Sequence, residues 1–185
     1  MTIFPSFITK NGIARTNRFV VNIVPPLNPS NQSGNIFFST YTNAFRDIPI
    51  ERAELPGISI NTTEYKYDQQ PTFNIPQERK PAGIAVITFI LDEKHQARQR
   101  IEEWLEIIIN KPKTSSGSIY SKGYYDEIVG TVQIIQLGID LKPSFGIQLI
   151  DAFPIAMDNV QFNWGEMNEY SRLNVTFSYF DTIIL

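Results

Sequence analysis

The alternation of hydrophobic and polar positions predicts a protein built mainly of β-strands. Residues 172–180 place apolar side chains on one face of a strand and small polar side chains on the other. Residues 159–164 repeat the pattern, with Phe162 and Trp164 on the apolar side. Further strands are predicted at residues 18–24, 58–67, 83–91, 128–137 and 145–150. We therefore expect a mostly antiparallel sheet or pair of sheets.

One segment has the period of an amphipathic helix instead. A single apolar stripe includes Ala97, Ile101 and Trp104, and charged side chains occupy the other sides. Asp92 is placed to cap the start and Pro112 to end the helix, which predicts a helix over about residues 92–109. The predicted core anchors, on this stripe and on the sheet, are Trp104, Ile101, Leu105, Ile108, Trp164, Phe162 and Phe177.

Two stretches predict long connections within a single domain that spans residues 1–185. Residues 27–50 begin with a run of Asn, Ser, Pro and Gly and are interpreted as a loop-rich insertion. Residues 65–82 contain three prolines and no periodicity, which predicts a long loop. The aromatic and aliphatic side chains in this second stretch argue against disorder, and long loops in compact domains are usually functional.

Composition removes most catalytic chemistry. The chain has no Cys and one His, so disulfides, thiolate nucleophiles and Cys- or His-rich metal centres are not expected. No Gly-rich phosphate loop, nucleophile elbow or zinc-protease motif occurs. The single His95 lies beside Glu93 and Lys94, and a surface hydrogen bond is favoured over a catalytic role. We predict no catalytic, metal or cofactor site.

Charge and hydropathy exclude further classes. Lys and Arg number 16 against 19 Asp and Glu, so a strongly basic nucleic-acid binder is not expected. No apolar run approaches the roughly 20 residues that span a bilayer, and residues 1–10 lack the features of an export signal. We expect no membrane insertion of the monomer.

The absence of charge from three strands is the most informative feature. Residues 83–91, 129–139 and 173–180 contain no charged side chain, whereas exposed strands usually carry Lys or Glu that discourage edge pairing. Two interpretations fit: strands that pair or stack across subunits, or a neutral polar wall along which a cargo slides. A monomeric sandwich with an amide-rich face remains an alternative.

Several blocks, in order, resemble the tail tube proteins of contractile-tailed bacteriophages. They are residues 15–23 (RTNRFVVNI), 53–57 (AELPG), 88–98 (TFILDEKHQAR), Trp104, 151–154 (DAFP) and 164–177, with Asn168, Glu169 and VTF at 175–177. The resemblance covers most of the chain. It implies a fold related to the tubes of type VI secretion and phage-like injection machines: a β-sandwich or barrel-like domain with one flanking helix.

The resemblance also implies an assembly. Six subunits would form a ring whose inner sheets join across subunits into a continuous barrel, and stacked rings would make a tube that conducts DNA without specific binding. Implied partners are further copies of the chain, the tail sheath, the baseplate and the tape-measure protein. The implied location is the virion tail, assembled in the host cytoplasm. Expected lumen-facing residues are Asn174, Thr176 and Ser178; expected inter-subunit or inter-ring residues are Tyr65, Tyr67, Phe73, Ile75, Leu55, Pro56 and Gly57.

Two other functions stay open. The insertion at residues 27–50 and the apolar end at residues 181–185 depart from the usual tube subunit, so a baseplate ring that initiates the tube is the second candidate. A monomeric carbohydrate- or ligand-binding sandwich, suggested only by the 8 Tyr and the loop-rich composition, is the third.

Overall fold

The computed structural model describes residues 13–26, 45, 48–68, 71–110, 121–122, 124–165 and 169–185. Most of the insertion predicted at residues 27–50 lies outside these residues, as does the proposed helix end at Pro112. The strands are β1 Phe19–Val24, β2 Ile50–Ala53, β3 Ile58–Tyr65, β4 Phe73–Pro81, β5 Ile84–Ile90, β6 Ile109–Asn110, β7 Ser121–Lys122, β8 Gly130–Leu137, β9 Pro143–Met157, β10 Arg172–Ser178 and β11 Asp181–Ile184; the helices are α2 Gln96–Ile108 and α3 Tyr125–Ile128.

Seven strands form one antiparallel sheet in the order β1-β8-β9-β10-β5-β2, with β11 also paired to β9. The long strand β9 serves two halves: its first part pairs with β8 and β11, and its last part pairs with β10. Asp151, at φ 51°, lies beside a register shift in the pairing of β9 with β8. We call β1, β8, β11 and the first part of β9 the β1–β8 half. The β5–β10 half consists of β2, β5, β10 and the last part of β9.

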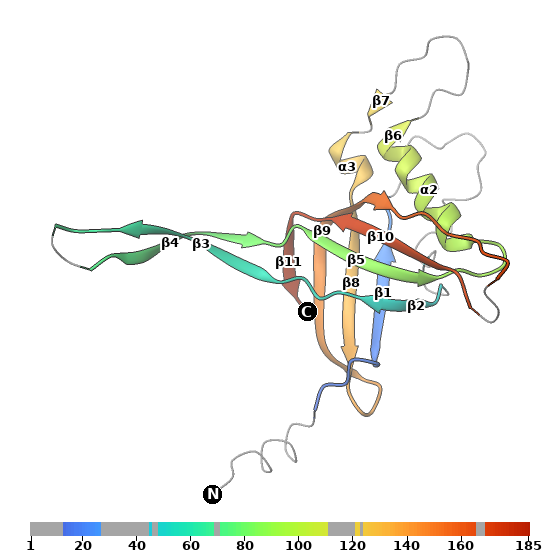
Figure 1. Ribbon diagram of the computed structural model, residues 1–185, viewed down its shortest axis with the longest axis horizontal. Coiled ribbons are helices and arrows are strands. Elements are labelled where there is room, and N and C mark those ends of the chain that lie inside the picture. The colour runs from blue at the N-terminus through green and yellow to red at the C-terminus, as the bar shows by residue number, and fades with distance from the viewer. Residues whose placement is uncertain are drawn as a thin grey trace, which may run out of the picture.

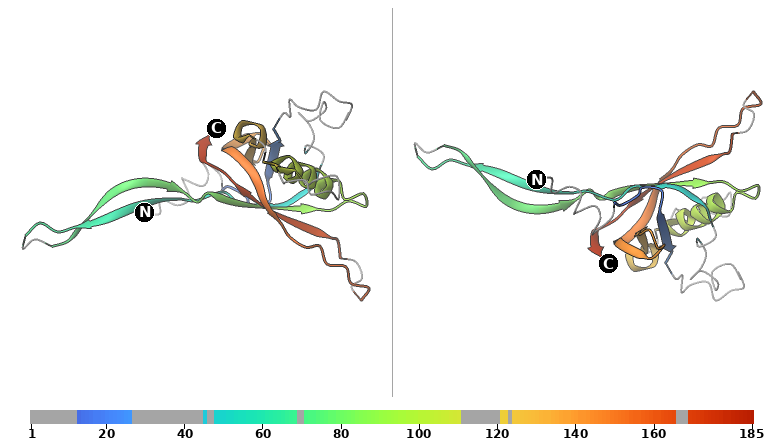
Figure 2. Two further views of the ribbon diagram at one scale, coloured as in Figure 1. Left: turned by 90° about the horizontal axis from the view of Figure 1, so that it is seen from above. Right: turned by 90° about the horizontal axis from the view of Figure 1, so that it is seen from below.

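The two halves and α2 enclose the core. The β1–β8 half and α2 lie on the same side of the β5–β10 half, which leaves the other face of β10 and β5 uncovered (Figure 1, Figure 2). The end strands β1 and β2 do not pair with each other, so the described strands do not close a barrel within one subunit. The prediction of a mainly β, sandwich-like fold with a flanking amphipathic helix is confirmed.

Trp104 connects the helix to both halves of the sheet. Its side chain is 1% exposed, its ring centroid lies 6.0 Å from that of Phe177, and its Nε1 donates a 2.9 Å hydrogen bond to the carbonyl of Ile128. Ile101 and Phe177 are also fully buried, while Leu105 and Ile108 are partly buried against this core. These five predicted anchors therefore lie where the helical and strand periodicities placed them.

The predictions for Phe162 and Trp164 are wrong. Their side chains are 76% and 101% exposed, and residues 159–164 form no strand. The side chain of Asn163 accepts a 3.0 Å hydrogen bond from the backbone N–H of Gly165, which turns the chain at Trp164. The alternation that suggested a half-buried strand belongs instead to an irregular loop.

The helix begins later than the sequence suggested. Residues 92–95 form a turn in which His95 has φ 51°, and α2 begins at Gln96. The Asp92 carboxylate accepts a 2.8 Å hydrogen bond from the Gln96 N–H, so Asp92 satisfies a free donor at the helix start.

None of the helices in the described part of the chain is long and apolar enough to cross a membrane.

Gly130 is required by the position of the Trp104 ring. A Cβ at residue 130 would lie 2.5 Å from the Val24 carbonyl oxygen and 2.8 Å from Cζ2 of Trp104. We expect Gly130→Ala to lower the free energy of unfolding by about 1–3 kcal/mol, because overpacking must displace the backbone or the indole. Thermal denaturation checks this against Gly57→Ala, whose added Cβ has no atom within 4 Å. Equal stability of the two variants would contradict the packing described.

Candidate functional site

A two-stranded arm extends from the body. Strands β3 and β4 pair antiparallel with each other, from Ile58 opposite Pro81 to Tyr65 opposite Phe73, and form a separate sheet. Nearly every side chain on both strands is exposed. Figure 1 shows the arm projecting along the longest axis of the molecule, away from the helices. We call β3, β4 and their connection the β-arm.

The β-arm corrects the prediction of a loop over residues 65–82. Pro76 pairs with Thr62 next to a register shift, and Pro81 is the last residue of β4. A bulge and a strand end are positions where a missing N–H is tolerated, and each strand of a two-stranded ribbon has an open edge. Pro76 and Pro81 therefore permit a strand that sequence composition alone argued against, and Pro71 lies before it.

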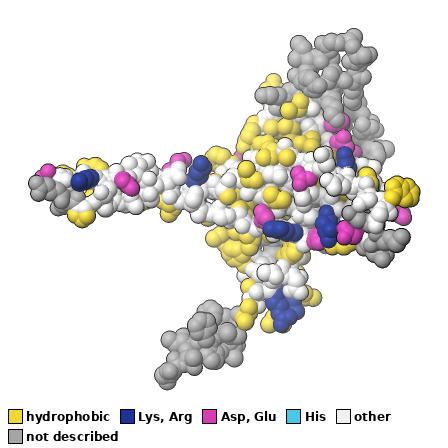
Figure 3. Space-filling view, in the orientation of Figure 1, with side chains coloured by type: hydrophobic (Ala, Val, Ile, Leu, Met, Phe, Trp, Pro, Cys, Tyr) yellow, Lys and Arg dark blue, Asp and Glu magenta, His cyan; other side chains and the backbone are white. Residues whose placement is uncertain are grey.

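Aromatic side chains cluster where the two strands of the arm meet its connecting loop. Tyr65 and Phe73 lie opposite each other with ring centroids 5.7 Å apart in an edge-to-face arrangement, and each is 48% exposed. Tyr67 is 66% exposed and Ile75 is 41% exposed. Hydrophobic side chains are visible along the arm in the space-filling view (Figure 3). No packed core covers these residues, so the arm presents apolar surface to solvent.

The root of the β-arm is fixed to the body. Residues Leu55, Pro56 and Gly57 join β2 to β3, and the Gly57 carbonyl accepts a 3.1 Å hydrogen bond from the Ala82 N–H across the ribbon. Leu55 is 48% exposed. The arm is thus a continuation of β2 and β5 rather than a separately attached loop.

The uncovered face of the β5–β10 half carries small polar side chains of β10 beside aliphatic side chains of β5, of which Ile84 is 53% exposed. Asn174, Thr176 and Ser178 alternate with the buried Leu173, Val175 and Phe177. The Thr88 hydroxyl donates a 2.9 Å hydrogen bond to the Asn174 side-chain oxygen, and the Asn174 amide donates a 3.0 Å bond to Asp158. The three residues expected to face a lumen therefore share one open face.

Two guanidinium groups beside this face are paired with carboxylates within the chain. Arg52 contacts Glu54 at 2.8 Å, and Arg172 Nε donates a 2.7 Å hydrogen bond to Glu51, which also accepts one from the Tyr170 hydroxyl. The Arg172 hydrogen bond, followed by that from Tyr170, holds the pKa of the Glu51 carboxyl below its usual value. Both guanidinium groups are therefore compensated by carboxylates. Sequence reasoning missed this cluster, because Glu51 and Arg172 lie 121 positions apart.

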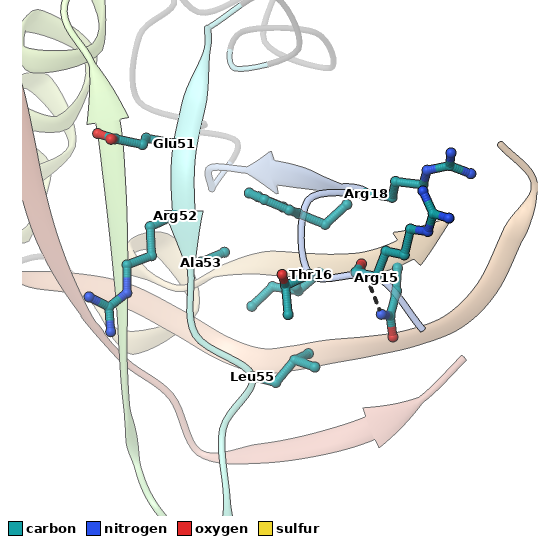
Figure 4. A pocket seen from close by; sticks show the side chains of 10 residues that line it. Arg15, Thr16, Arg18, Glu51, Arg52, Ala53 and Leu55 are labelled. Atoms are coloured by element: carbon teal, nitrogen blue, oxygen red, sulfur yellow. Dashed lines mark hydrogen bonds between the residues drawn. The ribbon is translucent and has the colours of Figure 1, made fainter. Parts of the chain in front are cut away.

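A cavity of about 300 Å³ opens between β1 and β2, which are the two edge strands of the sheet and do not pair with each other. Figure 4 shows Thr16, Ala53 and Leu55 facing this space, while Arg15 and Arg18 extend to one side and Arg52 to the other. The Arg18 guanidinium donates to the carbonyls of Gly138 and Ile139. No nucleophile and base converge among the residues that line the cavity.

Candidate metal and acid–base groups do not converge in the described residues. No group of three or more His, Asp or Glu side chains there is arranged to hold a metal ion. His95 makes an aromatic contact with Phe162, with ring centroids 6.1 Å apart. The β-arm, the open face of the β5–β10 half and the β9–β10 connection expose side chains that the core does not use.

Comparison with known families gives one full-length match. The family model for phage tail tube proteins matches residues 14–184. A search of curated proteins gives no match.

Solved structures share the fold at low sequence identity. A chain in the anti-feeding prophage baseplate is 15% identical with a TM-score of 0.62, covering 94% of this chain and 95% of that one. A chain in the anti-feeding prophage tube-terminating cap is 16% identical, with a TM-score of 0.63 and coverages of 100% and 99%. A chain in the sheath–tube complex of an extracellular contractile injection system is 13% identical, with a TM-score of 0.62 and coverages of 100% and 98%.

The family match and the fold shared with solved structures point to the same assignment. The family consists of structural tube proteins rather than enzymes, which accords with the composition of the chain. The chain belongs to the phage tail tube protein family.

Proposed function

We propose that the protein is the repeating subunit of a tail tube, in which six copies form a ring and rings stack coaxially. The observation that carries this proposal is the β-arm, with its exposed aromatic pair Tyr65 and Phe73. An isolated two-stranded ribbon is only marginally stable in water, so an arm of this length gains stability by docking on another subunit. The single-domain organisation over residues 1–185 is part of the same proposal.

The β-arm and its root supply the proposed contacts between subunits and rings. Tyr65, Tyr67, Phe73 and Ile75 offer the aromatic and aliphatic anchors that protein interfaces favour. Leu55, Pro56 and Gly57 lie where the arm leaves the body and would contact the neighbour nearest the root. Joining of the inner half-sheets across subunits would also occupy strand edges that a single subunit leaves unpaired.

The open face of the β5–β10 half is the proposed lumen wall. Asn174, Thr176 and Ser178 would then meet the DNA that passes through the tube. A wall that neutralised many phosphates would hold DNA through counterion release, whereas neutral hydroxyl and amide groups would let it slide. The ion pairs Arg52–Glu54 and Arg172–Glu51, both within one chain, neutralise two further guanidinium groups.

Adding cations to this wall is expected to impede DNA. The double substitution Thr176→Lys and Ser178→Lys should leave rings intact but cause DNA retention. For a wall that makes about six to ten phosphate contacts, the affinity for DNA falls about 10³–10⁵-fold between about 50 and 200 mM salt. DNA ejection from tails that carry the variant measures the effect, and Thr176→Asn with Ser178→Asn is the neutral control. Normal ejection at low salt with the Lys variant would place this face elsewhere.

The proposed partners are those of a tail. Additional copies of the chain form the tube, the sheath surrounds it, the baseplate meets one end and the tape-measure protein lies within it. The baseplate and sheath–tube structures that share the fold support the first three partners. The proposed location is the virion tail, assembled in the host cytoplasm.

A ring that initiates the tube at the baseplate is the second candidate. It is favoured by the similarity to a chain of a baseplate structure, which matches about as well as the chain of the sheath–tube complex. Copy number separates the two: the repeating subunit is an abundant band in purified tails, and an initiator is a faint one.

Electron microscopy of the purified protein tests the proposal directly. We expect six-fold rings that stack into tubes with an open channel. Light scattering on the same sample distinguishes this result from a monomeric ligand-binding sandwich, which would remain at 21.2 kDa at all concentrations. A strictly monomeric species under conditions that favour assembly would overturn the tube proposal.

A further inference from the structure

The connection between β9 and β10, residues 158–171, exposes aromatic side chains that the core does not use. Trp164 is 101% exposed and Phe162 is 76% exposed. Large aromatic side chains are usually buried at least in part, and contiguous exposed apolar patches mark interaction sites. We call the described residues 158–165 of this connection the Trp164 loop.

The Trp164 loop is held in shape by its own contacts. The Asn163 side chain accepts the 3.0 Å hydrogen bond from Gly165 and so bridges the residue between them, Trp164. The Phe162 ring lies against His95, in the turn that precedes α2. The indole is therefore presented on a formed turn, which lowers the entropy that a partner must overcome on binding.

The β-arm and the Trp164 loop lie at opposite ends of the same half-sheet. Strand β5 follows the arm directly, and its first residue, Ile84, pairs with Ser178 at the end of β10. The last residue of β5, Ile90, pairs with Arg172, where the chain returns from the connection. Both ribbon views show the arm at one extreme of the long axis and this connection at the other (Figure 1, Figure 2).

We infer that the Trp164 loop of one subunit receives the Tyr65–Phe73 end of the β-arm of another copy in an adjacent ring. This inference rests on the proposed tube function and names the partner surface of the arm. Two different surfaces at opposite ends of one subunit make a heterologous contact, which repeats in one direction without closing on itself. Such a contact extends a stack of rings.

The chemistry of the two surfaces matches. Residues 159–165 and residues 71–77 contain no charged side chain, while Asp158 begins the loop and Lys66 and Asp68 lie at the tip of the arm. Each presents exposed aromatic rings: Phe162 and Trp164 on the loop, Tyr65 and Phe73 on the arm. Trp and Tyr are the residues that most often dominate interface energetics. The arm of the same subunit lies at the far end of the sheet and therefore does not occupy its own loop.

Cross-linking in trans tests which surfaces meet. Because the chain has no Cys, Asn74→Cys on the arm and Gln161→Cys in the loop introduce the only thiols. The two variants are co-assembled and treated with a short bismaleimide. We expect a heterodimeric product that forms only in assembled tubes. The control pairs Asn74→Cys with Tyr124→Cys, an 80% exposed position beside α3, and should give none. No arm–loop product in assembled tubes, or equal yields for both pairs, overturns the inference.

Removal of the indole gives an independent readout. Trp164→Ala should leave the melting temperature unchanged, because the side chain is fully exposed. It should raise the protein concentration needed for tube growth about tenfold or more, as expected for an interface anchor. Tyr124→Ala, at a comparably exposed aromatic residue, should change neither.

The outcomes separate this inference from the proposed function. Normal growth with Trp164→Ala, while arm variants still block growth, would overturn the inference and leave the tube function standing. Normal growth with both kinds of variant would overturn the inference and the stacking role of the arm. Normal tubes that fail only to recruit sheath would assign the loop to the sheath and likewise overturn the inference.

Discussion

Replacing Phe73 and Ile75 together with Ser is expected to give a folded subunit that no longer polymerises. Both side chains are on the β-arm, outside the core, and are 48% and 41% exposed, so their loss should alter the free energy of unfolding of the body by no more than about 0.5 kcal/mol. In the proposed tube they are apolar anchors between rings, and truncation of central anchors commonly costs an interface about 2 kcal/mol or more each. The loss of tube growth should therefore be nearly complete.

Circular dichroism measures the thermal stability of the variant, and sedimentation measures whether it forms tubes. A wild-type melting curve together with the absence of fast-sedimenting tubes is the expected combination. Asn74→Ser is the matched control, because residue 74 lies between the two substituted positions and points to the opposite side of the strand. Tubes of normal length and salt resistance from the double variant would show that the arm does not stack rings. Residues 27–49 would then be the better candidate.

Trp104→Ala should have the largest effect on the stability of the subunit itself. The ring is 1% exposed, contacts Phe177 and donates a hydrogen bond to Ile128, so its removal leaves a cavity between α2 and both halves of the sheet. Aromatic-to-Ala substitutions in cores cost about 3–5 kcal/mol. For a chain of this length that corresponds to a fall in melting temperature of about 6–20 °C.

Trp104→Phe separates the two contributions of this side chain. It keeps an aromatic ring in the core but leaves the Ile128 carbonyl without its donor, so a smaller loss of stability is expected. Thermal and urea denaturation of the three proteins should rank wild type above Trp104→Phe and Trp104→Phe above Trp104→Ala. An unchanged melting temperature for Trp104→Ala would mean that α2 is not packed on the sheet in solution.

The elements with strong periodicity were predictable from the sequence. The apolar stripe through Ile101 and Trp104 predicted which face of α2 is buried. Alternation along β10 predicted which of its side chains enter the core. The start of the helix was displaced because Asp92 caps from four residues before Gln96, across a turn in which His95 has a left-handed conformation. Capping residues identify a helix start only when the intervening backbone conformation is known.

The exposed β-arm and Trp164 loop were harder to predict because they violate the rules that work in cores. Alternation placed Trp164 in a buried strand, although the Asn163–Gly165 hydrogen bond makes a turn there. Prolines argued for a loop where Pro76 instead fits beside a bulge in β4. Strand β11 and the pairing of Glu51 with Arg172 depend on contacts between distant parts of the chain, which local patterns do not report. Side chains selected for a partner do not follow the pattern of their own subunit.

The continuity of the β-arm with β5 determines how mechanical tension would enter the subunit. Only Ala82 and Gly83 separate β4 from β5, and the Gly83 carbonyl is itself bonded to the Tyr179 N–H. A pull along the arm therefore runs parallel to β5, whose seven register pairs with β10 lie perpendicular to the force. Hydrogen bonds in that geometry are loaded together in shear rather than peeled apart one after another. Force applied to one arm would thus be spread over the strands that build the wall of the subunit.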